Sequence, residues 1–102
     1  MIFDSPSLIE LRKKPELYLG CRSLVRLRPF IAGLRESESA KSRIASDKFF
    51  TGFTHWLVEL YSFPSAVYGW EKIISADSMD DRDAYDRFWK LYDEYRSQLM
   101  DE

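Results

Sequence analysis

The sequence predicts an all-α fold, a compact single-domain bundle of about five helices. Apolar residues recur at spacings of three and four along several segments, which is the period of an α-helix. The prolines and glycines do not bracket any convincing run of alternating, strand-like residues. The 102 residues are 45% hydrophobic and 16% aromatic, enough for one core built largely from rings. We therefore expect one domain over residues 1–102.

The first predicted helix covers residues 5–13. Ser5 is a favourable cap, and Pro6 suits the first helical position. Pro15 disfavours helical geometry at the residue before it, so the helix should end there.

The connection over residues 15–22 is expected to be tight. Leu17, Tyr18 and Leu19 are too apolar for a freely exposed loop, so we expect them to pack inward. Gly20 should adopt a positive φ or allow a close approach of backbone.

A second helix is predicted to begin after Ser23, which is a favourable cap. Its apolar stripe is formed by Leu24, Leu27, Ile31 and Leu34. Pro29 lies inside this pattern, where a proline removes one hydrogen bond and costs about 3 kcal/mol. The favoured interpretation is a continuous but bent helix. The alternative is one turn over residues 23–28, followed by a main helix with Pro29 in its first turn.

A third helix is predicted from Ser46 or Asp47 to about Tyr61. The polar, serine-rich segment before it, residues 35–46, is expected to be a mobile loop. One face of the helix carries Phe49, Phe53, Trp56 and Leu60. Gly52 weakens a helix by about 1 kcal/mol, so we expect another helix to pack closely against it.

Two further helices complete the predicted fold. A short one, with Ser65 or Ser62 as its cap, should include Val67, Trp70, Ile73 and Ile74. The Tyr-Gly-Trp triplet at 68–70 weakens its start, so the alternative is a helix that begins only near Gly69. The β-branched residues also make a strand conceivable, but it would have no obvious partner. The last should begin at Ser78, with Asp81 three residues later in a variant of the capping box. It has the clearest amphipathic pattern, with an apolar face of Ala84, Phe88, Leu91, Tyr92, Tyr95 and Leu99.

The sequence offers little that is suited to catalysis or metal binding. Cys21 and His55 are the only residues of their kinds, and no catalytic motif or ligand spacing accompanies either of them. The four glycines are too widely separated to form a phosphate-binding loop. We expect no enzyme activity, no cofactor and no metal site.

No segment approaches the roughly 20 apolar residues that span a bilayer. The first residues, Met-Ile-Phe-Asp-Ser-Pro, lack the basic start and long apolar run of a signal peptide. We therefore expect a cytoplasmic protein with no membrane partner.

The formal net charge is −2, but the charge is distributed unevenly. Residues 1–48 hold ten Lys and Arg against six Asp and Glu, whereas residues 77–102 hold four against nine. Such an asymmetry is a hint about partners.

The acidic half has the sharper pattern. Three aspartates, Asp83, Asp86 and Asp93, share one stripe of the last helix with Lys90. Three more lie at the N-terminal end of that helix: Asp77, Asp80 and Asp81. Helix capping and i,i+4 pairs account for part of this charge. Two interpretations stay open, a solvated helix face and a surface that selects a basic protein partner.

The basic half suggests an alternative function, a small nucleic-acid-binding or regulatory domain. Its cations could line a phosphate-binding surface: Arg12, Lys13, Lys14, Arg22, Arg26 and Arg28. The net charge is negative and no DNA-binding motif is present, so solvated helix faces and ends are favoured and no nucleic-acid partner is expected. A plain oligomerisation module is a third possibility.

Residues distributed from about position 8 to 95 carry a family resemblance. They are Lys14-Pro15, Tyr18-Leu19-Gly20, Ser23-Leu24, Arg26-Leu27, Phe30-Ile31, Gly33-Leu34, Phe53, Trp56-Leu57, Gly69-Trp70, Ile73-Ile74, Ala84-Tyr85-Asp86-Arg87-Phe88-Trp89 and Leu91-Tyr92-Asp93-Glu94-Tyr95. In these positions the chain resembles small bacterial immunity proteins of polymorphic or contact-dependent growth-inhibition toxin systems. Most of the matching positions determine the fold.

The resemblance implies a non-enzymatic immunity protein that binds a cognate toxin C-terminal domain and blocks it. Many such toxins are basic nucleases, and an acidic inhibitor can compete for a cleft that attracts phosphates. The resemblance supplies no binding residue. From the charge pattern we predict a partner surface in which three rings serve as anchors if they are exposed. Its residues are Asp77, Asp80, Asp81, Asp83, Asp86, Asp93, Glu94, Trp70, Tyr85 and Trp89.

Overall fold

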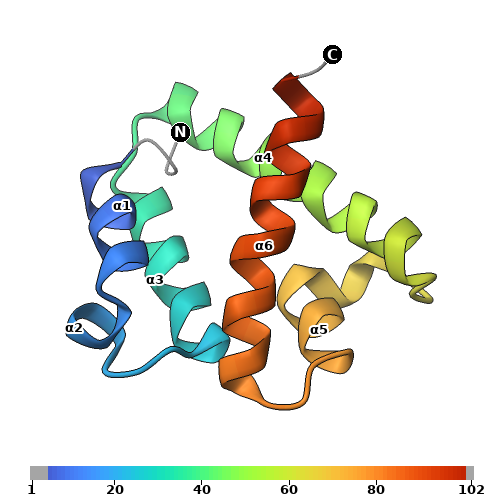
Figure 1. Cartoon of the computed structure of the whole chain (residues 1–102). Coiled ribbons are helices and arrows are strands. Elements are labelled where there is room, and N and C mark those ends of the chain that lie inside the picture. Colours follow the sequence, from blue (N-terminus) through green and yellow to red (C-terminus); the bar gives the residue numbers. More distant parts are fainter. Residues whose placement is uncertain (1–4, 101–102) are drawn as a thin grey trace.

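This computed structural model describes residues 5–100 of the chain (Figure 1). Within this range the chain forms six α-helices and one 3-10 turn, and no β-strand. The elements are α1 (Pro6–Lys13), α2 (Pro15–Leu19), α3 (Leu24–Glu36), α4 (Ala40–Tyr61), η2 (Ala66–Tyr68), α5 (Gly69–Ala76) and α6 (Asp81–Met100). The all-α prediction is confirmed. The two ends of the predicted domain, residues 1–4 and 101–102, lie outside the described residues.

Helix α6 occupies the middle of the bundle. Helices α1, α2 and α3 lie on one side of it, α5 lies on the other, and the long helix α4 crosses behind (Figure 1). Helix α6 contacts α3, α4 and α5 directly. Phe88 and Phe53, from α6 and α4, are completely buried, and their ring centroids are 6.0 Å apart. The core is therefore built around the aromatic side of α6.

Several predicted helix boundaries are confirmed. The Ser5 hydroxyl oxygen accepts a hydrogen bond from the Ser7 N–H, and the Ser23 oxygen accepts one from the Arg26 N–H at 3.1 Å. Gly20 has a φ of 82°, in the left-handed region that glycine tolerates. Helix α3 continues through Pro29, and α5 begins at Gly69.

The loop predicted over residues 35–46 is wrong for most of its length. Only residues 37–39 separate α3 from α4, because the Ser39 hydroxyl oxygen caps α4 by accepting from the Ser42 N–H. Ser46 is buried and donates to a Glu38 carboxylate oxygen at 2.8 Å. Residues 40–46 are helical because Ser39 caps the helix and the buried Ser46 hydroxyl finds a partner in Glu38.

The predicted start of the last helix was placed too early. Helix α6 begins at Asp81, and the cap is Asp80, whose carboxylate accepts from the Asp83 N–H at 2.8 Å. The Ser78 hydroxyl instead donates to the Ile74 carbonyl at 2.7 Å and so closes the end of α5. Aspartate and serine are equally good caps, so the local sequence did not distinguish them.

Some apolar residues predicted to face inward are exposed. Residues 15–22 include the short helix α2, which buries Leu19 but leaves Leu17 73% exposed. Tyr18, Leu60, Val67 and Leu99 are also largely exposed. A helix of five residues has room for one inward face only, so a run of three apolar residues cannot all be buried there.

Gly52 of α4 faces the ring of Tyr95 on α6, as the prediction of close helix packing required. A Cβ at position 52 would collide with the Tyr95 hydroxyl. That ring is held by aromatic neighbours, with centroids 5.3 Å from Phe49 and 5.5 Å from Trp56.

We therefore expect Gly52→Ala to lower the free energy of unfolding by about 1–3 kcal/mol, because overpacking outweighs the gain in helix propensity. Gly33→Ala is the matched control, since nothing lies within 4 Å of its added Cβ. It should raise stability by about 0.5–1 kcal/mol. Urea unfolding of both variants measures the difference, and equal effects would contradict the packing argument.

A second prediction concerns the ion pair that joins α3 to α4. The Arg35 guanidinium donates to both carboxylate oxygens of Asp47, at 2.5 and 2.6 Å, and these hydrogen bonds lower the Asp47 pKa below its usual 3.8. A lowered pKa stabilises the fold above the unfolded-state pKa, and this contribution disappears as the pH falls through the folded-state value. The stability advantage of the native protein over Asp47→Asn should thus be constant near neutral pH and shrink below pH 3.8. Urea unfolding over a pH series measures it, and a difference that grows on acidification would refute the assignment.

Candidate functional site

The opposite charges of the two ends of the chain meet in the folded protein. Arg12 of α1 donates to both carboxylate oxygens of Asp93 on α6, at 2.9 and 2.5 Å. Arg22, in the connection before α3, donates to Asp86 at 3.2 Å. The hydrogen bond with Asp93 raises the Arg12 pKa above its usual value. We call these two pairs the Arg–Asp ladder, because they run along one side of α6.

Asp81 is occupied in holding a neighbouring helix. Its carboxylate accepts from the Ser23 hydroxyl and from the N–H groups of Leu24 and Val25, at 2.9 and 3.0 Å for the last two. These groups form the N-terminus of α3, where an anion also interacts favourably with the helix dipole. Asp81 thus fixes the start of α3 against the start of α6.

The other acidic residues at the start of α6 have structural partners too. Asp77 and Asp83 both pair with Arg87, at 2.9 and 3.2 Å. Asp83 also accepts a hydrogen bond from the Met79 N–H at 2.9 Å, and its own N–H donates to the capping carboxylate of Asp80. Apart from Asp81, the aspartates predicted as one acidic surface therefore form two groups. One holds Asp77, Asp80 and Asp83 at the start of α6, and the other holds Asp86 and Asp93 in the ladder.

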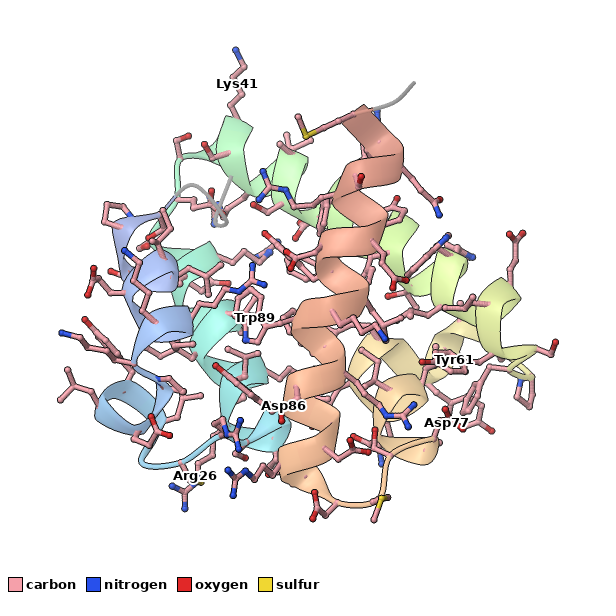
Figure 2. The ribbon with its side chains drawn as sticks, in the orientation of Figure 1. Arg26, Lys41, Tyr61, Asp77, Asp86 and Trp89 are labelled. Atoms are coloured by element: carbon pink, nitrogen blue, oxygen red, sulfur yellow. The ribbon has the colours of Figure 1, made fainter. Side chains whose placement is uncertain are left out.

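Figure 2 places the two groups on different sides of α6. Asp86 and Trp89 lie on the side toward α1 and α3, whereas Asp77 lies near Tyr61 on the side of α5. The structure brings Asp86 and Asp93 together in the ladder and separates them from Asp77. Glu94 is exposed on α6.

The three rings predicted as anchors do not offer an exposed aromatic face. Tyr85 and Trp89 are 3% and 8% exposed, so they do not meet the condition of exposure. Trp70 is half-buried. Its ring stacks on Phe50 and lies tilted against Phe88, with centroid distances of 5.6 and 5.0 Å. Tyr85 and Trp89 belong to the core because the apolar face of α6 is wider than its simplest periodic stripe.

A polar groove of about 520 Å³ lies between α1, α2 and the N-terminal half of α6. Its lining residues are Arg12, Lys13, Pro15, Glu16, Arg22, Arg82, Tyr85, Asp86 and Trp89. The Arg12 guanidinium also lies over the Trp89 ring, 4.6 Å from its centroid. The sequence carried no signal for this groove, because its two walls are about 70 residues apart along the chain.

Two donors beside the groove lack hydrogen-bond partners. The Tyr85 hydroxyl and the Trp89 indole N–H are buried, and neither forms a hydrogen bond of normal geometry within the described part of the chain. Burial raises the Tyr85 pKa above its usual 10.0, and the neighbouring Trp89 N–H opposes this rise only in part. Each unmade hydrogen bond in a buried place destabilises the fold.

Four of the six cations predicted to line a phosphate-binding surface are bound within the protein. Besides the two arginines of the ladder, Arg26 donates to the Leu19 carbonyl at 2.7 Å and Arg28 pairs with Glu71 at 3.3 Å. A surface that collects phosphates needs cations that are free to replace counterions. This arrangement gives the nucleic-acid alternative little support.

No group of three or more His, Cys, Asp and Glu side chains in residues 5–100 is arranged to hold a metal ion. Cys21 and His55 are both exposed. None of the helices in the same range is long and apolar enough to cross a membrane.

Comparisons of the chain with family models, curated proteins and solved structures gave no match. The functional argument therefore rests on the residues and geometry of this chain.

The role of Asp81 leads to a prediction about stability. Asp81→Ala removes three hydrogen bonds to the start of α3 and should lower the free energy of unfolding by about 2 kcal/mol. Glu94→Ala, an exposed acidic residue on the same helix, is the control and should change it by less than about 0.5 kcal/mol. Urea unfolding, with hydrogen exchange of the Leu24 and Val25 amides, measures both, and equal losses would contradict the capping role.

Proposed function

We propose that this protein is an immunity protein, which binds the C-terminal domain of a cognate bacterial toxin and neutralises it by covering its active site. The observation that carries the proposal is the Arg–Asp ladder on one side of α6. Asp86 and Asp93 have side chains that are 50% and 53% exposed, and each is held in place by an arginine. They retain acceptor capacity for donors on a partner.

A fixed set of charges suits a surface that must bind tightly. Side chains that are ordered before binding lose less conformational entropy when the complex forms. Alternating cations and carboxylates also select a partner with the complementary order of charges, because like charges placed opposite one another cost several kcal/mol. The ladder supports a specific protein interface better than a general attraction to basic surfaces.

The proposed toxin activity is that of a nuclease, and inhibition would follow from competition. The cleft of a nuclease attracts phosphates with positively charged groups. Carboxylates held at the surface of α6 would occupy some of those groups and keep the substrate out. The resemblance to immunity proteins supports this mechanism. The chemistry of a binding surface requires no catalytic group in this chain.

The test uses the C-terminal domain encoded by the gene immediately upstream, expressed in bacteria with and without this protein. We expect co-expression to restore growth, and the two purified proteins to form a complex that weakens with added salt. Loss of growth despite co-expression, together with no complex, would refute the proposed function.

A charge swap separates the binding surface from stability. In the double variant Arg22→Asp and Asp86→Arg, the ion pair is preserved with its direction reversed, so the unfolding midpoint should stay within a few degrees of the native value. Affinity for the toxin domain should fall at least about tenfold, equivalent to about 1.4 kcal/mol. The matched control swaps Arg35 with Asp47, a pair that joins α3 to α4 away from the ladder.

That control should keep affinity for the toxin domain. Its stability should fall, because Arg35 also pairs with Glu36 and Asp47 lies near Arg43. Calorimetric titration with the toxin domain and growth assays measure the outcomes. Full neutralisation by the variant swapped at positions 22 and 86 would contradict the placement of the binding surface on the ladder.

A further inference from the structure

The polar groove has more positive than negative groups in its walls. Four cations line it, against the carboxylates of Glu16 and Asp86. Two of the cations, Arg12 and Arg22, are engaged in the Arg–Asp ladder. The other two, Lys13 and Arg82, line the groove and form no ion pair with another described residue.

The base of the groove holds the second observation. Tyr85 and Trp89 line it, are more than nine-tenths buried, and carry a hydroxyl and an indole N–H without partners. These residues are four apart and their ring centroids are 6.4 Å apart, so both come from one side of α6, and both line the groove. An indole N–H can only donate, and a buried phenol that has no acceptor still has a hydrogen to donate.

We propose that this groove binds a carboxylate, and that in the toxin complex the carboxylate is an acidic side chain of the toxin. This identification of the partner group rests on the proposed function. The oxygens of one carboxylate would accept from the Tyr85 hydroxyl and the Trp89 N–H, with Lys13 and Arg82 balancing its charge. Hydrogen bonds of this kind, between neutral or cationic donors and an anion, are among the strongest in proteins.

A phosphate group fits the groove less well. It would bring a charge of nearly −2 next to the carboxylates of Glu16 and Asp86, which also line the groove. A carboxylate brings a single charge and accepts from two neighbouring donors. The Arg12 guanidinium lies over the Trp89 ring, so a shift of this side chain that keeps its ion pair with Asp93 would admit the carboxylate. Rotamer changes of this size are common when proteins bind.

The first experiment uses acetate as the probe and the three indole N–H signals in a nitrogen-15 NMR spectrum as the readout. Sodium acetate replaces sodium chloride at constant ionic strength and pH. We expect the Trp89 signal to move in a saturable way while those of Trp56 and Trp70, which lie outside the groove, stay in place. A Trp89 signal that does not move, or that moves no more than the other two, overturns the proposal.

Two variants and a second anion sharpen this result. Tyr85→Phe removes one donor and should abolish the movement without lowering the unfolding midpoint, because the hydroxyl has no partner to lose. Tyr68→Phe, which removes an exposed hydroxyl outside the groove, should leave the movement unchanged. Phosphate at the same ionic strength should move the Trp89 signal less than acetate, and a larger effect of phosphate overturns the choice of a carboxylate.

The second experiment measures affinity for the toxin domain. Tyr85→Phe and Arg82→Gln should each weaken binding about tenfold relative to the native protein, with Tyr68→Phe as the control. If the native protein neutralises the toxin and both groove variants bind it equally well, the groove is not used and the inference fails while the function stands. If acetate moves the Trp89 signal but the toxin domain does not bind, the function fails and the carboxylate site stands.

Discussion

The central position of α6 is the constraint on which the rest of the structure depends. One side of this helix supplies fully buried rings such as Phe88, and the helix contacts α3, α4 and α5. Apolar burial of this kind supplies most of the favourable free energy of folding. Close approach of α4 is possible because Gly52 leaves room for Tyr95, so a small residue on one helix sets the packing of another.

The charged groups at the edges of α6 act differently from its rings. Exposed ion pairs contribute about 0–1 kcal/mol each, so the Arg–Asp ladder adds little to stability. Its effect is geometric, since it aligns α1 and the connection before α3 with two positions seven residues apart on α6, Asp86 and Asp93. Asp81 does the same for the start of α3. The carboxylates that remain half-exposed are therefore held in a fixed arrangement, which is what a selective surface needs.

The unpartnered donors of Tyr85 and Trp89 stand out against a fold in which other polar groups are well used. Serine and aspartate side chains cap the helices, and arginines of the basic half such as Arg12, Arg22 and Arg26 pair with carboxylates or a carbonyl. A phenylalanine at position 85 would fill the same space without an unmade hydrogen bond, so the tyrosine lowers stability where it stands. Such exceptions are expected at functional places, where binding a ligand recovers the lost hydrogen bonds.

Local signals in the sequence were enough to determine the all-α class, the caps at Ser5 and Ser23 and the need for close packing at Gly52, because each depends on a few neighbouring residues or on helical periodicity. At Gly20 they left two alternatives, a positive φ or a close approach of backbone, and the structure shows the positive φ. The helix over residues 40–46 and the cap at Asp80 were missed, since several polar residues there could cap equally well. The candidate site was decided by tertiary structure alone. Arg12 and Asp93 are 81 residues apart, and Arg22 and Asp86 are 64 apart, so no local pattern shows that these charges cancel one another. The position of α1 and α2 beside α6 determines which aspartates remain half-exposed for a partner. The same arrangement buries Tyr85 and Trp89 and forms the groove that they line.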